Sequence, residues 1–275
     1  MPWSVLDIYS KVLPRTNCRE CGFSTCMAFA SMVVSEGVPL EKCPHVAPEK
    51  LKSIKEDLKN QQEAGKWTRR DPAKDALKWA MTRAASMKIE DLPMRIGGRL
   101  IEVDGEKALE IPYFLDTLLI LPRRIVKKGG GSLNRWEQVF IYNHMAQGGM
   151  REPTGKWKGL VELPNTVSKI KTMEGNVERP IAERFRGHGE DLVKAALAMG
   201  GSPLEKDDSG AEVAVIFRPL PRIPVMLMFW DEEGGEGFGA QAKLLFDETI
   251  VEHLDIESIL FMSERIRQLL CGEGT

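Results

Sequence analysis

The chain has 275 residues, a formal net charge of −2 and 43% hydrophobic residues. This length and apolar fraction suffice for one sizeable core together with a small additional module. A near-neutral chain with mixed charges lacks the basic patch that is typical of nucleic-acid-binding proteins. No apolar run reaches the roughly 18 residues that a membrane-spanning helix needs. No basic region followed by an apolar one opens the sequence, so we expect no secretory signal.

The first predicted elements are helices on either side of a loop. Ser4 is placed to cap a short helix with apolar residues at helical spacing, and a loop over residues 14–23 follows. Residues 24–36 predict a helix that ends at Gly37. Pro48 then opens an amphipathic helix, which completes a small helical module.

This module carries four cysteines in the spacing C-x2-C-x4-C-x16-C: Cys18, Cys21, Cys26 and Cys43. Three thiols within nine residues and one beyond a helix-length spacer can converge on one centre, and four thiolates suit an iron–sulfur cluster or a tetrahedral zinc ion. The uneven spacing and the proline after the last cysteine favour the cluster, and zinc is the alternative. Unrelated buried cysteines or disulfides fit this spacing less well, since nothing marks the chain as secreted.

Two further features of the module suit a cluster. Gly22 lets backbone N–H groups turn toward sulfur. The helix over residues 24–36 would point its N-terminus at the cluster, where unpaired N–H groups favour negative charge. His45, two residues after Cys43, is expected to tune the surroundings of the cluster rather than to bind iron.

The residues around the cysteines form a recognisable pattern: Leu6-Asp7-Ile8-Tyr9, Leu13-Pro14, Asn17-Cys18, Glu20-Cys21-Gly22, Thr25-Cys26, Ala28-Phe29-Ala30 and Cys43-Pro44. This pattern resembles the N-terminal cluster module of the corrinoid iron–sulfur protein large subunit, and a similar module occurs in the B subunit of Rnf-type electron-transport complexes. The resemblance implies one low-potential 4Fe–4S cluster bound by Cys18, Cys21, Cys26 and Cys43. In the corrinoid family such a cluster delivers single electrons that return cobalt(II) to cobalt(I), in an anaerobic cell.

Short polar and basic residues at positions 65–72 indicate a linker, so the expected domains are 1–64 and 73–275. Beyond the linker the pattern predicts a helix over residues 75–87, then short strands between residues 96 and 120 with a hairpin turn at Asp104-Gly105.

The remaining predicted elements are mixed helices and strands, with a flexible Gly129-Gly130-Gly131-Ser132 loop before them. The helices cover residues 136–147 and 180–199, with a last one capped by Asp255; the strands cover residues 213–217 and 225–230. Because helices and strands come in blocks, the expected fold class is α+β, a small helical cluster module followed by a larger mixed domain.

The second domain resembles an uncharacterised family of anaerobic bacteria that is often fused to this cluster module. The residues that carry this resemblance are Leu160-Val161-Glu162-Leu163-Pro164, Pro221-Arg222-Ile223-Pro224 and Leu244-Leu245-Phe246-Asp247. It implies no activity. The chain is too short for the barrel and corrinoid-binding domain of the corrinoid protein, and it lacks the further cysteine runs of the Rnf subunit.

Several other residues suggest chemistry. His144 could ligate a metal or cobalt, but Tyr142 and Gln147 stand where the corrinoid-binding signature Asp-x-His-x-x-Gly needs Asp and Gly, so a packed helix histidine is favoured. Cys271 is expected to be an inert or frayed thiol. The acidic run Asp231-Glu232-Glu233 with the glycines after it is expected to be a solvated turn rather than a carboxylate site.

Together these features predict a cytoplasmic electron-transfer protein rather than a stand-alone enzyme. Its partner would be a ferredoxin or a corrinoid protein, with no nucleic acid and no membrane. A corrinoid (cobalamin) is a second possible cofactor, and a stripe of Met226, Met228, Phe229 and Trp230 is a candidate cover for its flat face, although such a stripe is typical of a core. The alternatives are a relay that docks a partner enzyme without a second cofactor, and a redox enzyme with its site in the second domain.

Overall fold

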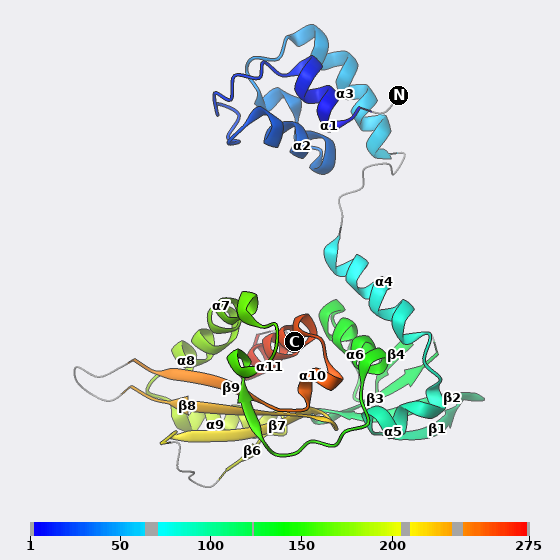
Figure 1. Cartoon of the computed structure of the whole chain (residues 1–275), viewed down its shortest axis with the longest axis vertical. Coiled ribbons are helices and arrows are strands. Elements are labelled where there is room, and N and C mark those ends of the chain that lie inside the picture. Colours follow the sequence, from blue (N-terminus) through cyan, green and yellow to red (C-terminus); the bar gives the residue numbers. More distant parts are fainter. Residues whose placement is uncertain (1–2, 64–70, 123, 205–209, 233–238, 274–275) are drawn as a thin grey trace. The chain divides into compact units, whose positions relative to one another are not determined.

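Figure 1 shows the computed structural model of the chain, which describes residues 3–63, 71–122, 124–204, 210–232 and 239–273. The chain divides into two compact units, Met1–Pro72 and Ala73–Thr275, here called unit 1 and unit 2. Each unit has its own cluster of buried apolar side chains. Every helix among the described residues is too short or too polar to cross a membrane.

Unit 1 is helical. Its elements are α1 (Val5–Asp7), a π-helical turn (Ile8–Val12), α2 (Cys26–Glu36), a 3-10 turn (Leu40–Lys42) and α3 (Pro48–Glu63). Buried side chains from all of them form the core, among them Ile8, Phe29, Val33, Leu40 and Ile54. The chain's beginning is tied to α3, because the amide of Gln61 accepts from the Trp3 N–H at 2.6 Å and donates to its carbonyl at 2.9 Å.

The ends of the helices in unit 1 follow the predicted signals closely. The Ser4 hydroxyl accepts from the Asp7 N–H, and the Asp7 carboxylate accepts from the Ser4 N–H, so the predicted cap is a full capping box. Helix α2 ends at Gly37 as predicted, with a φ of 66°. It begins later than predicted, because Thr25 is its cap and Cys26 its first residue.

Unit 2 contains two antiparallel sheets and a set of mostly short helices. The helices are α4 (Pro72–Ala84), whose first residue is the last of unit 1, α5 (Leu92–Ile96), α6 (Arg135–Gln147), α7 (Ile170–Met173), α8 (Arg179–Phe185), α9 (Gly189–Ala198), α10 (Ile250–His253) and α11 (Ile256–Leu270). Short 3-10 turns lie at Ile89–Asp91, Leu160–Glu162 and Val167–Lys169, and a π-helical turn at Glu174–Glu178 joins α7 to α8.

The first sheet of unit 2 is a four-stranded meander in the order β1-β2-β3-β4. Its strands are β1 (Arg99–Val103), β2 (Glu106–Tyr113), β3 (Asp116–Leu121) and β4 (Arg124–Lys127). The predicted hairpin turn joins β1 to β2, and both of its residues have positive φ, 53° at Asp104 and 80° at Gly105. This is the backbone of a type I′ turn, so the Asp-Gly signal is confirmed.

The second sheet has the order β5-β9-β8-β7-β6. Its strands are β5 (Trp157–Gly159), β6 (Ser202–Pro203), β7 (Val213–Leu220), β8 (Ile223–Trp230) and β9 (Gln241–Asp247). The two predicted core strands are confirmed as β7 and β8, and β8 is the central strand. An irregular register between Phe217 and Leu220 accommodates Pro219, which cannot donate to a neighbouring strand.

One continuous core joins the two sheets and the helices of unit 2. Helices α8 and α9 pack on strands β9 and β7, helix α6 packs on α11, and β2 approaches β7 (Figure 1). The Phe114 N–H donates to the Pro219 carbonyl at 3.2 Å, which links the two sheets directly. A helical module followed by a mixed domain is the α+β class that the sequence predicted.

Some predicted elements were wrong in extent. Residues 180–199 form two helices, α8 and α9, because Gly187 has a φ of 69° and ends the first. The helix predicted over residues 75–87 is α4, which begins and ends three residues earlier. Most of the predicted linker, and the glycines after Glu232 other than Gly239, lie outside the described residues.

The stripe suggested as a cover for a corrinoid is part of the core. Met226, Met228 and Phe229 are at most 6% exposed, and with the half-buried Trp230 they belong to the central strand β8. Because Met226, Met228 and Phe229 are already buried by the protein itself, they offer no open surface to cover the face of a bound macrocycle. That interpretation of the stripe was wrong.

Candidate metal centre

The cysteine loop of unit 1 has an unusual backbone. Three residues other than glycine take positive φ within five positions, Arg15 at 62°, Asn17 at 52° and Arg19 at 67°, and Gly22 follows at 84°. A Cβ added at Gly22 would meet nothing within 4 Å, so its role is conformational and not steric. Left-handed backbone costs free energy at residues other than glycine, so other contacts must hold this loop in shape.

Asn17 supplies the contact that joins the loop to helix α2. Its side-chain oxygen accepts from the Cys26 N–H at 2.8 Å, and asparagine tolerates the left-handed region better than most residues. The Gly22 N–H also donates to the Arg19 carbonyl at 2.9 Å. These bonds place Cys18 and Cys21 on a turn directly before the first residue of α2.

The four cysteines differ in burial. Cys18 is exposed and Cys21 half-buried, whereas Cys26 and Cys43 are 6% and 5% exposed. Burial raises the pKa of the Cys43 thiol, a hydrogen bond from the His45 backbone N–H opposes that rise, and the charges of Cys21, Cys18 and Cys26 add to it. The Cys43 sulfur therefore lies within electrostatic reach of the other three, and a bound metal centre would hold all four as thiolates.

The spacing of the sulfurs bears on the choice between a cluster and a single zinc ion. Zn–S bonds of about 2.3 Å in a tetrahedral site bring the ligand sulfurs within about 4 Å of one another. Among the described residues, the one group of three metal-binding side chains with ligand atoms within 4.8 Å of one another is Cys18, Glu20 and His45. No three of the four thiols are that close, which fits ligands spread around a cluster, where each thiolate binds a different iron.

His45 and Glu20 form a polar pair beside Cys18. The His45 ring nitrogen Nε2 lies 3.1 Å from the Glu20 carboxylate, and both side chains are exposed. His45 therefore contributes twice, through its ring near Cys18 and through its backbone N–H to Cys43. The sequence pointed to His45 but not to Glu20, because a single glutamate between two cysteines carries no signal of its own.

The expected stabilisation by free N–H groups at the start of α2 is reduced. The Cys26 N–H is occupied by Asn17, and the Ala28 N–H donates to the Thr25 hydroxyl at 3.0 Å. In the described residues, hydrogen bonds are found for two of the first three N–H groups of this helix. The N–H of Met27 is the one left to donate to an anionic neighbour. The prediction of an open helix N-terminus was wrong, because the chain caps its own helix.

The other candidate residues lie in unit 2, and among the described residues none of them belongs to a group of three metal-binding side chains. His144 and His253 are 1% and 0% exposed, with ring centroids 5.5 Å apart, and each ring bonds a backbone carbonyl. His144 is therefore the packed helix histidine that was favoured. Burial raises the pKa of Cys271, which ends α11 and is half-buried against the core.

The acidic turn is also structural. A carboxylate oxygen of Asp231 accepts from the Gly187 N–H at 2.7 Å, and Glu232 lies 3.4 Å from Arg186. Asp231 thus joins the end of β8 to the break between α8 and α9. The described residues of this turn act as a structural tie, not as ligands.

A buried carboxylate that sequence reasoning missed lies in the core. Glu137 accepts from the Tyr113 hydroxyl at 2.7 Å and from the Asn134 N–H at 2.8 Å, and it lies 3.0 Å from Arg265. Burial, and next the charge of Glu137, raise the pKa of Tyr113 well above its usual range. The group ties β2, α6 and α11 together, and the capping pattern Asn-x-x-Glu was the available signal.

Comparison with known families gives two matches. The sequence model of the family described as "Domain of unknown function (DUF3786)" matches residues 90–268, more than half of the chain. The model described as "Putative Fe-S cluster" matches residues 13–45, a range that includes all four cysteines. Both resemblances drawn from the sequence, a cluster module and an uncharacterised second domain, are confirmed. No solved structure matches the chain significantly.

Curated relatives match the N-terminal region. The chain is 49% identical over 47 residues to the corrinoid/iron-sulfur protein large subunit of Moorella thermoacetica, which is 17% of this chain and 10% of that protein. It is 38% identical over 55 residues to the acetyl-CoA decarbonylase/synthase complex subunit gamma of Methanocaldococcus jannaschii, 20% of this chain and 11% of that subunit. The gamma subunit of Archaeoglobus fulgidus is 30% identical over 119 residues, 42% of this chain and 21% of that subunit. The chain thus spans a small part of the length of these relatives.

Proposed function

The chain belongs to the family described as Domain of unknown function (DUF3786), and we propose that this member is an iron–sulfur electron-transfer protein. Cys18, Cys21, Cys26 and Cys43 would hold one 4Fe–4S cluster in unit 1. The observation that carries the proposal is the placement of these four thiols, which lie within electrostatic reach of Cys43 without any three of them gathering within 4.8 Å as around one zinc ion. The 49% identity to a corrinoid/iron-sulfur protein in this region supports the same assignment.

The residues of the module have separate tasks in this proposal. When bound, a 4Fe–4S cluster accepts and donates single electrons. Cys26 and Cys43 are buried against the module core and would shield one side of the site from water. The N–H of His45 donates to the Cys43 sulfur, and bonds of this kind tune cluster potential. Cys18 and Cys21 are the accessible side, where a redox partner can approach.

The assignment of ligands is tested by metal content. Protein purified without oxygen should contain about four irons per chain and give a paramagnetic signal at low temperature after reduction with dithionite. Cys21→Ala should lose most of the iron. Cys271→Ala is the matched control and should keep it, because this thiol lies in unit 2. Stoichiometric zinc without iron would overturn the proposal, and iron loss from the control would show that the ligand set is wrong.

The finer proposal concerns the acceptor. We infer that the reduced module passes one electron to a corrinoid, taking cobalt(II) to cobalt(I), because the similar proteins include one named for both a corrinoid and an iron–sulfur centre. The corrinoid would be carried by a partner, since Tyr142 and Gln147 replace the signature residues beside His144 and that histidine is buried. In a mixture of reduced protein and a cobalt(II) corrinoid protein, the cobalt(I) absorption should appear at a rate that rises with protein concentration.

Two other functions compete with this one. A relay would transfer electrons to a partner enzyme without any corrinoid, and a redox enzyme would use a site in unit 2. The corrinoid experiment separates them from the main proposal. If the cluster is present but no cobalt(I) forms, the relay becomes the better account; if oxidation of the cluster follows addition of a small substrate, the enzyme does.

A further inference from the structure

Unit 2 contains a cavity of about 940 Å³ that no predicted function uses. It lies under helix α4, and its other walls come from the start of α5, the end of β3 and helix α6. The volume is at the upper end of the range typical of small-molecule sites. All the lining residues lie in unit 2, so the inference drawn from this cavity is independent of the cluster.

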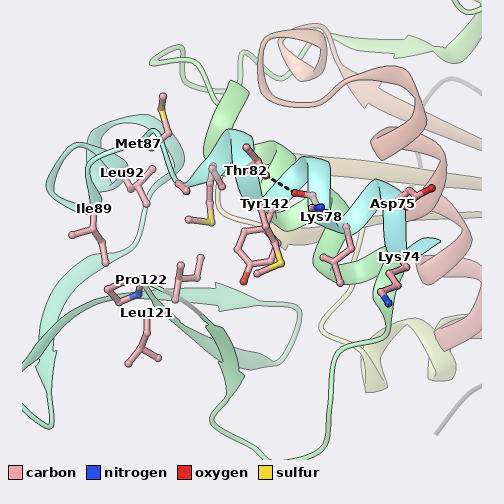
Figure 2. Close-up of a pocket in the computed structure, with 16 residues that line it drawn as sticks. Lys74, Asp75, Lys78, Thr82, Met87, Ile89, Leu92, Leu121, Pro122 and Tyr142 are labelled. Atoms are coloured by element: carbon pink, nitrogen blue, oxygen red, sulfur yellow. Dashed lines mark hydrogen bonds between the residues drawn. The ribbon is translucent and has the colours of Figure 1, made fainter. Parts of the chain in front are cut away.

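The cavity has one apolar end and one charged end, as Figure 2 shows. Met87, Ile89 and Leu92 lie at one end, and Lys74 and Asp75 at the other. Helix α4 accounts for this polarity, because its residues at helical spacing change from lysine near the N-terminus to Met81 and Ala84 further along. A ligand that fits both ends must itself be amphipathic.

Tyr142 is the polar group inside the cavity. Its side chain is 6% exposed and comes from α6, and Figure 2 shows it between the two ends. Among the described residues its hydroxyl has no hydrogen-bond partner, and burial alone raises its pKa. The hydroxyl oxygen is not one of the fully buried polar atoms that lack a partner, so it is accessible from the cavity and can donate to a ligand oxygen.

The charge at the polar end favours an anion. Two lysines, Lys74 and Lys78, and one carboxylate, that of Asp75, line that end. No ion pair of Lys78 is found among the described residues, and its side chain is exposed, so its ammonium can pair with a ligand. A negatively charged head group could therefore contact Lys78 and Tyr142 together.

The apolar end suits a flexible hydrocarbon. Three methionines, Met81, Met87 and Met145, line the cavity with Leu92 and Ile120. Methionine side chains are unbranched and polarizable, so they adapt to ligands of varied shape. Along helix α4 the lining runs from Lys74 to Ala84, about 15 Å at the rise of an α-helix, which is long enough for a medium-length acyl chain.

We propose that this cavity binds an amphipathic organic anion of the fatty-carboxylate class. The carboxylate accepts from Tyr142 and pairs with Lys78, and the hydrocarbon chain extends toward Met87 and Leu92. The site gives unit 2 a ligand-binding role that is separate from electron transfer.

The test uses the full chain and dodecanoate as the probe, measured by isothermal titration calorimetry. One molecule should bind per chain, and each methylene removed from the probe should weaken binding roughly fourfold. Tyr142→Phe should weaken binding about tenfold and Lys78→Gln about fivefold. The matched controls are Tyr9→Phe in unit 1 and Lys171→Gln on the exposed surface of α7, and neither should change the affinity.

A second readout locates the probe. With methyl-labelled methionine, nuclear magnetic resonance should show the signals of Met81, Met87 and Met145 shifting on addition of dodecanoate, and those of Met226 and Met228 in strand β8 staying in place. The proposal is overturned if the binding of dodecanoate does not saturate, or if the cation dodecyltrimethylammonium binds with equal affinity. It is also overturned if the Tyr142 and Lys78 variants bind dodecanoate with the affinity of the parent. Shifts confined to other methionines would also overturn it.

Discussion

At the scale of single residues, Asn17 connects the strained loop to the helix that bears Cys26. Its side chain bonds the Cys26 N–H, and its φ of 52° is one that alanine adopts at a cost. Asn17→Ala should therefore let a chelator remove iron at least about tenfold faster from the oxygen-free protein. Asn17→Asp keeps both the acceptor and the tolerance for positive φ, so it should resemble the parent. Equal iron loss from the two variants would show that the bond is unimportant.

His144 should make unit 2 sensitive to acid. Burial lowers the pKa of His144 to about 3, while the ring of an unfolded chain titrates near 6.5. Between about pH 6.5 and pH 3 the His144 ring is protonated in the unfolded chain but stays neutral in the folded chain. The free energy of unfolding therefore falls as pH drops from about 6.5 toward about 3. At pH 5 this amounts to about 2 kcal/mol, and the lowered pKa of His253 acts in the same direction.

Urea denaturation at pH 7 and pH 5 measures that dependence. His144→Gln cannot titrate, so the loss of stability between the two pH values should be smaller than in the parent, even if the variant is less stable at both. His188→Gln is the control, because this side chain is exposed and lies 3.9 Å from Asp191. If both variants lose as much stability between pH 7 and pH 5 as the parent does, His144 is not the cause of the acid sensitivity.

The sequence identified the residues of the candidate centre but not their environment. Cysteine spacing is a local property, and it pointed to the four thiols before any fold was known. Their unequal burial, and the position of Glu20 beside His45, depend on how the loop packs on α2. In the sequence, Tyr142 was noted only because it stands where the corrinoid-binding signature needs an aspartate. Its place in a cavity follows from the path of α4, which the sequence does not show.

At the scale of elements, the start of strand β1 requires a glycine at position 98. Its φ is 86°, and a Cβ there would lie 2.5 Å from the Glu110 carbonyl oxygen on the paired strand β2. Gly98→Ala should therefore cost about 3 kcal/mol or more, because strain and a backbone clash add. Gly187→Ala is the matched comparison: its φ is also positive but nothing lies within 4 Å, so about 1 kcal/mol is expected. Equal losses in urea denaturation would show that the clash is relieved by movement of β1.

Elements with strong local signals were predictable and weaker ones were not. The Asp-Gly turn, the apolar strands β7 and β8, and the Asp255 cap of α11 all carry their signals within a few residues. The break at Gly187 was missed because the apolar spacing continues on both sides of it. Strand β9 alternates exposed and buried residues, but its pairing with β8 and β5 depends on distant partners.

At the scale of the whole molecule, the two units have separate cores, and no residue belongs to both clusters. We expect each unit to fold by itself. Limited proteolysis should cut first near residues 65–72 and release a fragment beginning near residue 73, which should keep its circular dichroism spectrum without iron. Unfolding of the purified fragment would mean that unit 2 depends on unit 1.

The unequal burial of the four thiols also determines where oxygen reaches the module first. An iron held by the exposed Cys18 would be attacked before one held by Cys26 or Cys43, which lie at 6% and 5% exposure. A cluster held by these four thiols would therefore meet oxidants first on the side of Cys18, while the module core covers the side of Cys26 and Cys43.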